Sequence, residues 1–366
     1  MKTLRHLLSV LLCVFTFLCI GCSGDDHSDI RKAISTELDS LKSPDTDEAY
    51  SYLSQSDLFP DGTDASNETP SAEVKDVFSM FFKNFDYSIQ SVTVSEDGNT
   101  ATASVRLTTI DAGALSKDFA SSSLREAIKA AAKTGGSESR ASIGERYLLL
   151  NHLLKTGEYG SVESDCTIKL TNNDNSWTVD HTATLENQLV GGLVSRLADP
   201  YILTPEETID IYLGTIRKMS TDELSSYLGL TGLYSESDDS LKQIYNAMVD
   251  QVHEHFNYKI QDSTQSGTSA AVGVGITSFN SDAIMERYHA EMDSYLATAD
   301  AVIEGSDARL AYSRDLLLKC IKENTDVTEN SVSFSLKNDG VSWKLLDPGQ
   351  AFGEALFGTI DVDGEA

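Results

Sequence analysis

The residues best suited to chemistry are few and lie far apart in the chain. His253-Glu254-His255 is the most metal-like cluster, but it lacks the His-Glu-x-x-His spacing of helical zinc sites, and no third ligand is close in sequence. Asp180 and His181 could act as acid and base in an isomerase-like cavity. Adjacent residues of a strand point to opposite faces, however, so both could not line one cavity. We therefore assign no catalytic residue, no metal ligand and no cofactor.

The two cysteines in the body of the chain, Cys166 and Cys320, fall on a predicted strand and a predicted helix and are expected to be small core residues. A disulfide between them is an alternative, since export would permit it. The acid-rich turns at residues 61–64 and 361–364 lack the regular spacing of a calcium loop. The chain also has no Gly-x-Ser-x-Gly elbow, phosphate loop or dinucleotide fingerprint.

The N-terminus carries the clearest functional pattern. A basic start with Lys2 and Arg5 is followed by an apolar run at residues 7–20 and then by Gly21 and Cys22. This order is typical of an export signal, and the run is shorter than the roughly 20 residues that span a bilayer. Ile20-Gly21-Cys22 resembles a bacterial lipobox, although Cys19 stands where leucine is usual.

The lipobox resemblance implies that Cys22 is diacylated and becomes the mature N-terminus. We expect a signal peptide at residues 1–21, a tether at residues 22–28, and a protein held on the extracytoplasmic side of the cell membrane. Its first partner is then the lipid bilayer, through acylated Cys22. An ordinary secretory signal with an incidental cysteine is the alternative.

The amino-acid composition excludes some classes of function. The chain has 366 residues, with 28 Lys+Arg against 57 Asp+Glu and a formal net charge of -29. Such an acidic protein repels phosphate, which excludes a nucleic-acid partner. With 40% hydrophobic residues, the chain can form real cores, and its length suggests two domains.

The second half of the chain repeats the pattern of the first. Residues 85–90 (FDYSIQ) match residues 256–261 (FNYKIQ), and the two tryptophans, Trp177 and Trp343, fall on each other. The offset drifts only from 175 to 166 along the chain. We therefore predict a duplication, with domains at residues 29–197 and 204–360 and an acidic tail at residues 361–366.

Each half is predicted to begin with helices and to continue with two strands, a helical excursion, a final hairpin and a short helix. The strands are expected at residues 85–94, 101–110, 161–170 and 176–185, and at residues 256–262, 269–279, 328–336 and 341–346. The excursions are expected as helices at residues 123–132 and 142–155, and at residues 281–303 and 307–323.

The opening TPEETI at residues 204–209, the STDE at residues 220–223 and the terminal Ser-Trp strand resemble export-anchored bacterial domains of the nuclear-transport-factor-2-like (cystatin-like) superfamily. The resemblance covers roughly residues 29–197 and 204–360. It implies an α+β fold of two duplicated cone-like domains, each with N-terminal helices on a curved antiparallel sheet. The helical insertion before the last hairpin departs from the minimal family fold.

The shared aromatic residues Tyr87, Trp177, Tyr258 and Trp343 have two interpretations. They pack the sheet against the helices, or they form the wall of an apolar pocket. The superfamily includes isomerases, dehydratases and non-catalytic binding modules, so the fold alone implies no activity. We expect a non-catalytic binding or envelope-interaction module whose partner is a small apolar ligand or an envelope protein. The alternatives are an isomerase- or hydrolase-like enzyme that uses the cavity of one domain, and a structural spacer.

Overall fold

The computed structural model describes residues 27–42, 58–59, 72–134, 141–230, 238–303, 305–346, 349–358 and 360. The predicted signal peptide, Cys22 and most of the tether lie outside these ranges. So do the acid-rich turn at residues 61–64 and the acidic tail at residues 361–366.

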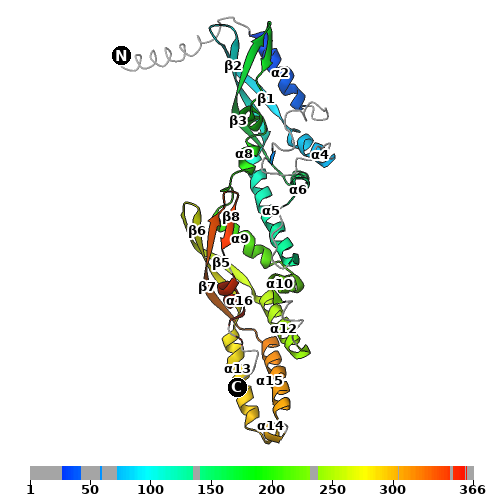
Figure 1. Cartoon of the computed structure of the whole chain (residues 1–366), viewed down its shortest axis with the longest axis vertical. Helices are drawn as coiled ribbons and strands as arrows, with labels where there is room; N and C mark the ends of the chain where they lie inside the picture. The colour runs from blue at the N-terminus through cyan, green and yellow to red at the C-terminus, as the bar shows by residue number, and fades with distance from the viewer. Residues whose placement is uncertain are drawn as a thin grey trace, which may run out of the picture.

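The first half of the chain forms one antiparallel sheet with helices around it (Figure 1). The strand order is β1-β2-β3-β4, so that each strand pairs with its neighbour in sequence. In chain order the elements are α2 (Ser28–Lys42), α4 (Ala72–Phe81), β1 (Asp86–Val94), β2 (Thr100–Ile110), α5 (Ala112–Thr134), α6 (Ile143–Thr156), β3 (Ser161–Asn173), β4 (Ser176–Val179), α7 (Ala183–Leu189) and α8 (Leu193–Leu197).

The second half has the same sheet order, β5-β6-β7-β8. Its elements are α9 (Pro205–Ile216), α10 (Thr221–Tyr227), α12 (Asp239–His255), β5 (Asn257–Ser266), β6 (Ser269–Phe279), α13 (Ser281–Leu296), α14 (Ala299–Ile303), α15 (Gly305–Lys322), β7 (Val327–Asn338), β8 (Trp343–Leu346) and α16 (Gly349–Phe357). The predicted α+β class with two sheet-based halves is confirmed, and each helical excursion lies between the second and third strands, as expected.

The two sheets also share their irregularities. The register of the first strand pair shifts after Ile89, and that of the corresponding pair shifts after Ile260. Trp177 on β4 pairs with Asn172 on β3, and Trp343 on β8 pairs with Asn338 on β7. The two tryptophans therefore occupy equivalent strands and equivalent register positions.

Periodicity explains why these segments bury the faces they do. Alternate residues of β2 face the first core, because side chains of a strand alternate between its two faces. In α2 the buried residues recur at helical spacing and form a stripe against the sheet. The members of these two rows are Ala101, Ala103, Val105 and Leu107, and Ile30, Ile34, Leu38 and Leu41.

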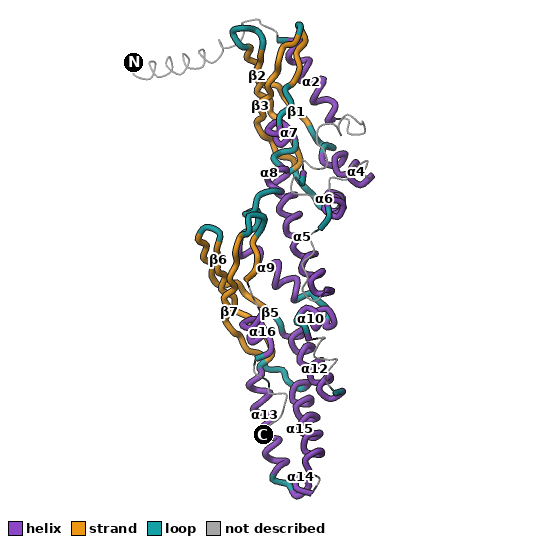
Figure 2. Tube along the Cα trace, in the orientation of Figure 1, coloured by secondary structure: helices purple, strands orange, loops and turns teal. Residues whose placement is uncertain are grey.

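Helix α5 joins the two halves into one elongated body. It starts beside the first sheet and runs along α9 to α10, as Figure 2 shows. Near its end, Ile128 and Ala132 are buried in the core of the second half. The Ser226 hydroxyl donates a hydrogen bond to the carbonyl of Ala132, and Lys117 forms an ion pair with Glu207. The buried apolar contact carries most of this junction, since exposed ion pairs contribute little.

Three predicted boundaries are wrong for local reasons. Helix α5 begins at Ala112 rather than at residue 123, because the Asp111 carboxylate accepts the backbone N–H of Ala114. The strand expected to reach residue 185 ends at Val179, since Thr182 caps α7. The single helix expected over residues 281–303 is broken after α13, where a turn at Ala297 separates it from α14.

Candidate functional site

Tyr87 and Tyr258, two of the predicted pocket aromatics, hold a helix to a strand in the same way in each half. The Tyr87 hydroxyl donates to the Asp39 carboxylate at 3.0 Å, and the Tyr258 hydroxyl donates to the Asp210 carboxylate at 2.9 Å. The two tyrosines are 171 residues apart in sequence, and so are the two aspartates; this common offset aligns α2 with α9. Burial, assisted by the aspartate, raises the pKa of Tyr258 to about 12, so this phenol stays protonated at neutral pH.

A cation lies against each of these rings. The Lys42 ammonium is 4.5 Å from the centre of the Tyr87 ring, and the Arg217 guanidinium is 5.6 Å from the centre of the Tyr258 ring. Such cation–π contacts contribute about 0.5–1 kcal/mol at exposed sites. In each tyrosine the hydroxyl is hydrogen-bonded to an aspartate and the ring is in contact with a cation, so both residues attach a helix to the sheet.

Trp343 is covered by the segment that connects the halves. Only 4% of its surface is exposed, and the ring of Tyr201 packs edge-on against it at 5.8 Å between ring centres. The Asn338 amide beside it donates to the carbonyl of Pro200 at 2.7 Å and accepts the N–H of Gly340. The second half thus fills the space over its tryptophan with its own tyrosine.

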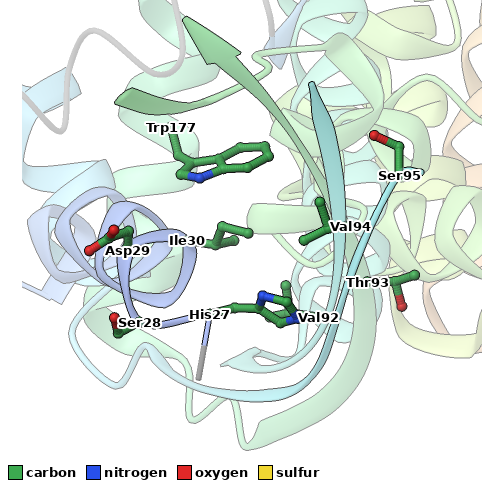
Figure 3. A pocket seen from close by; sticks show the side chains of 9 residues that line it. All are labelled: His27, Ser28, Asp29, Ile30, Val92, Thr93, Val94, Ser95 and Trp177. Atoms are coloured by element: carbon green, nitrogen blue, oxygen red, sulfur yellow. The ribbon is translucent and has the colours of Figure 1, made fainter. Parts of the chain in front are cut away.

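Trp177, at the equivalent position, borders an open hollow of about 690 Å³ (Figure 3). Figure 3 shows the indole over Ile30 of α2, with Val92 and Val94 of β1 on the other side. The remaining lining residues are His27, Ser28, Asp29, Thr93 and Ser95. Of the four predicted pocket aromatics, Trp177 is the one that lines this hollow.

Ile30 takes the place that Tyr201 has in the second half. The 171-residue offset that relates the two Tyr–Asp pairs also relates Ile30 to Tyr201. Each lies against the tryptophan of its own half. An isoleucine lacks the ring that covers Trp343, so Trp177 is left half-buried beside an open space.

A second exposed surface lies at the opposite end of the molecule. Here α13, α14 and α15 form a helical projection whose tip carries Val302 and Ile303, which are 74% and 79% exposed. Further exposed apolar residues near it are Leu296, Leu310 and Tyr312. We call these five residues the apolar tip. The segment 293–312 has four acids and one base, so the apolar tip has an acidic border.

The other residues with chemical potential are not assembled into a centre. His253, Glu254 and His255 end helix α12, and the described residues hold no group of three metal-binding side chains. Asp180 accepts a hydrogen bond from the Thr171 hydroxyl at 2.8 Å. The His181 imidazole instead lies 3.3 Å from the Glu37 carboxylate.

Cys166 and Cys320 are free thiols buried in the two separate cores, so the alternative of a disulfide between them is wrong. Burial raises the pKa of Cys166 to about 11 and also raises that of Cys320. Both thiols are therefore protonated at neutral pH, and neither is a ready nucleophile.

Comparison with known proteins gives little further guidance. No protein-family model matches the sequence, and no curated protein matches it. Among solved structures, the chain is similar to ycdA of Bacillus subtilis, a protein whose name assigns it provisionally to the lipoproteins. The two are 10% identical with a TM-score of 0.27, over 74% of this chain and 96% of the other. This likeness is too low to carry an argument, and the expected resemblance to the cystatin-like superfamily stays a prediction.

Sequence reasoning missed the apolar tip and the open side of Trp177. The dipeptide Val302-Ile303 followed by Glu304 and Gly305 could have indicated a helix end with exposed apolar residues. The sequence alone does not reveal that Ile30 stands in the first half where Tyr201 stands in the second, because this equivalence appears only when α2 and α9 are aligned through their Tyr–Asp pairs.

Proposed function

We propose that this chain is a lipid-anchored extracytoplasmic protein that acts as a non-catalytic binding module of the cell envelope. The lipobox-like Cys22 supplies the anchor. The first described residue, His27, follows it by five residues, which span at most roughly 18 Å of extended chain. The end of the molecule that bears α2 would therefore stay near the bilayer.

The observation that carries the proposal is the position of the apolar tip, at the end of the molecule opposite α2 (Figure 1). Exposed apolar clusters with a polar border are typical of protein interaction sites. An anchor at one end and a contact surface at the other suit a protein that reaches a partner away from the membrane. Within the described residues, no helix is long and apolar enough to cross a bilayer.

Comparison of the two halves indicates what kind of partner fits. We infer that the halves are copies of one domain, which makes α5 the counterpart of α13. The far end of α5 is covered by α9 and α10, through Ile128 and Ala132. Within the described residues, Val302 and Ile303 at the end of the second projection stay exposed. A helical surface of another protein would cover the apolar tip in the corresponding way.

Charge narrows the partner further. The end of α5 carries Lys129 and Lys133, and the cap of α10 that it meets carries Glu223. Hydrogen bonds from Ser220 lower the pKa of Glu223, and the two lysines add to this effect. At the apolar tip the border is acidic instead. The partner should therefore present an apolar recess bordered by lysine or arginine, whereas a second copy of this acidic chain would be repelled.

The test places a photo-crosslinking residue at position 303 of the full-length chain in its own host. A cross-linked envelope protein is then purified, and its binding to the wild-type chain is measured by calorimetry. Val302→Asp should weaken this binding by about tenfold or more, as is typical of an interface hot spot. Val341→Asp is the matched control, since Val341 is 59% exposed on a turn far from the tip, and it should leave binding unchanged. Cross-links only to lipid or to a second copy, or none at all, would overturn the proposal.

A further inference from the structure

We propose that the hollow beside Trp177 is a binding site for an aromatic ring of the size of a tyrosine side chain, presented by another molecule. This site is separate from the apolar tip and lies at the opposite end of the protein. The proposal does not depend on which partner the tip binds.

The chain contains its own example of the bound state. In the second half the Tyr201 ring packs against Trp343 with an interplanar angle of 75°, which is the edge-to-face geometry that aromatic pairs prefer. In the first half the equivalent residue is Ile30, which leaves the matching face of Trp177 without a ring. An aromatic ring from outside would restore there the packing that the second half makes internally.

The lining of the hollow is polar over most of its surface, with an apolar part next to the indole. Val92 and Val94, both half-buried, can contact a ligand in the hollow, whereas Ile30 beside them in Figure 3 is only 2% exposed. The volume of about 690 Å³ lies within the range of roughly 300–1,000 Å³ that is usual for small-ligand sites. The polar part of the lining includes Ser28, Thr93 and Ser95.

An unused acceptor lies next to the same tryptophan. In the second half both ends of the Asn338 amide are hydrogen-bonded, one of them to the carbonyl that precedes Tyr201. Asn172, which pairs with Trp177 in register, donates to the carbonyl of Gly98, but its buried Oδ1 has no partner among the described residues. In the second half the corresponding Oδ1 accepts the N–H of Gly340, so the two amides beside the tryptophans differ in their hydrogen bonding.

The probe is N-acetyltyrosinamide, with N-acetylalaninamide as the control that lacks the ring. The full-length protein is labelled with ¹⁵N-tryptophan, which gives two indole N–H signals, because the chain has two tryptophans. The Trp343→Phe variant assigns them. The tyrosine probe should shift the Trp177 signal saturably, with a Kd on the order of 1 mM for so small a ligand. The Trp343 signal should not move, and the alanine probe should shift neither signal.

Two variants make the test reciprocal. Val94→Phe fills the hollow from strand β1 and should weaken binding of the probe at Trp177 by about tenfold or more. Tyr201→Ala removes the internal ring and should open the second site, so that the Trp343 signal now responds to the probe as well. Tyr201 is 45% exposed, so its loss leaves no large internal cavity.

Three results would overturn the proposal. The first is a Trp177 signal that stays fixed up to 20 times the expected Kd. The second is an equal response to the alanine probe, which would mean that the ring contributes nothing. The third is a probe response in Val94→Phe equal to that of the wild type, which would locate the contact outside the hollow. If Tyr201→Ala fails to fold, the comparison of Val94→Phe with the wild type still decides.

Discussion

The packing of α5 across the junction predicts that a residue of the first half stabilises the core of the second. Ile128 is 5% exposed and lies among the buried residues of the second half. Ile128→Ala removes three carbon groups, at about 0.8 kcal/mol for each buried CH₂, and leaves a cavity. Together these terms predict a loss of about 3 kcal/mol in the free energy of unfolding.

The assay follows urea unfolding through Trp343 in a Trp177→Phe background, where it is the remaining indole. Trp343 belongs to the same core as Ile128, so its fluorescence should report the loss directly. A loss of about 3 kcal/mol corresponds to a fall of roughly 6–12 °C in the melting temperature of a unit of 150–250 residues. Lys129→Ala, at the next and exposed position, is the control and should change stability by less than about 0.5 kcal/mol.

The result that refutes this reasoning is a Trp343 transition that Ile128→Ala moves no further than Lys129→Ala does. The second half would then be stable without α5, and the halves would be neighbours in one chain rather than parts of one body. A first-half transition that moves alone, followed through Trp177 in a Trp343→Phe background, would lead to the same conclusion.

Three further outcomes are expected. Cys22→Ala should release the protein from membranes or leave it unprocessed, and a palmitate analogue that still labels this variant would contradict the proposed anchor. Cys166 and Cys320 should resist Ellman's reagent at pH 8 in the native protein and react in urea, because burial raises the pKa of both thiols; fast native labelling would show that the cores are open. Tyr258→Phe should cost about 1 kcal/mol at pH 7, since a hydrogen-bonded hydroxyl is lost. The folded pKa of Tyr258, about 12, is above the unfolded value of about 10, so the stability that its hydroxyl contributes is present below pH 10 and is lost as pH rises through 12. Between pH 9 and pH 11, the urea midpoint should therefore fall more in the wild type than in Tyr258→Phe.

The sequence predicted the sheets well, because strand periodicity and turn residues are local. The final hairpin of each half follows from patterns within about ten residues, and the equivalence of Trp177 and Trp343 follows from the repetition of that pattern. Helix boundaries were less predictable, since they depend on single caps such as Asp111 and Thr182.

The candidate sites were harder to predict, because they depend on contacts between distant segments. The same sequence pattern that pairs Tyr87 with Tyr258 cannot tell whether these rings line a pocket or hold a helix. The Asp39 and Asp210 carboxylates that bind them are 48 residues away in each case. The exposed side of Trp177 depends on the absence of a ring at Ile30, which no local pattern reveals.

The junction also has a consequence for the order of events during synthesis. A chain is made from its N-terminus, so the apolar end of α5 at Ile128 and Ala132 emerges before the helices that cover it. From the end of α5 at Thr134 to the end of α10 at Tyr227 is 93 residues, which take roughly 5–20 s at usual rates of translation. During that interval the newborn first half exposes the surface most prone to wrong association. Because α9 and α10 are the first elements of the second half, the cover arrives before any strand of the second sheet has been made.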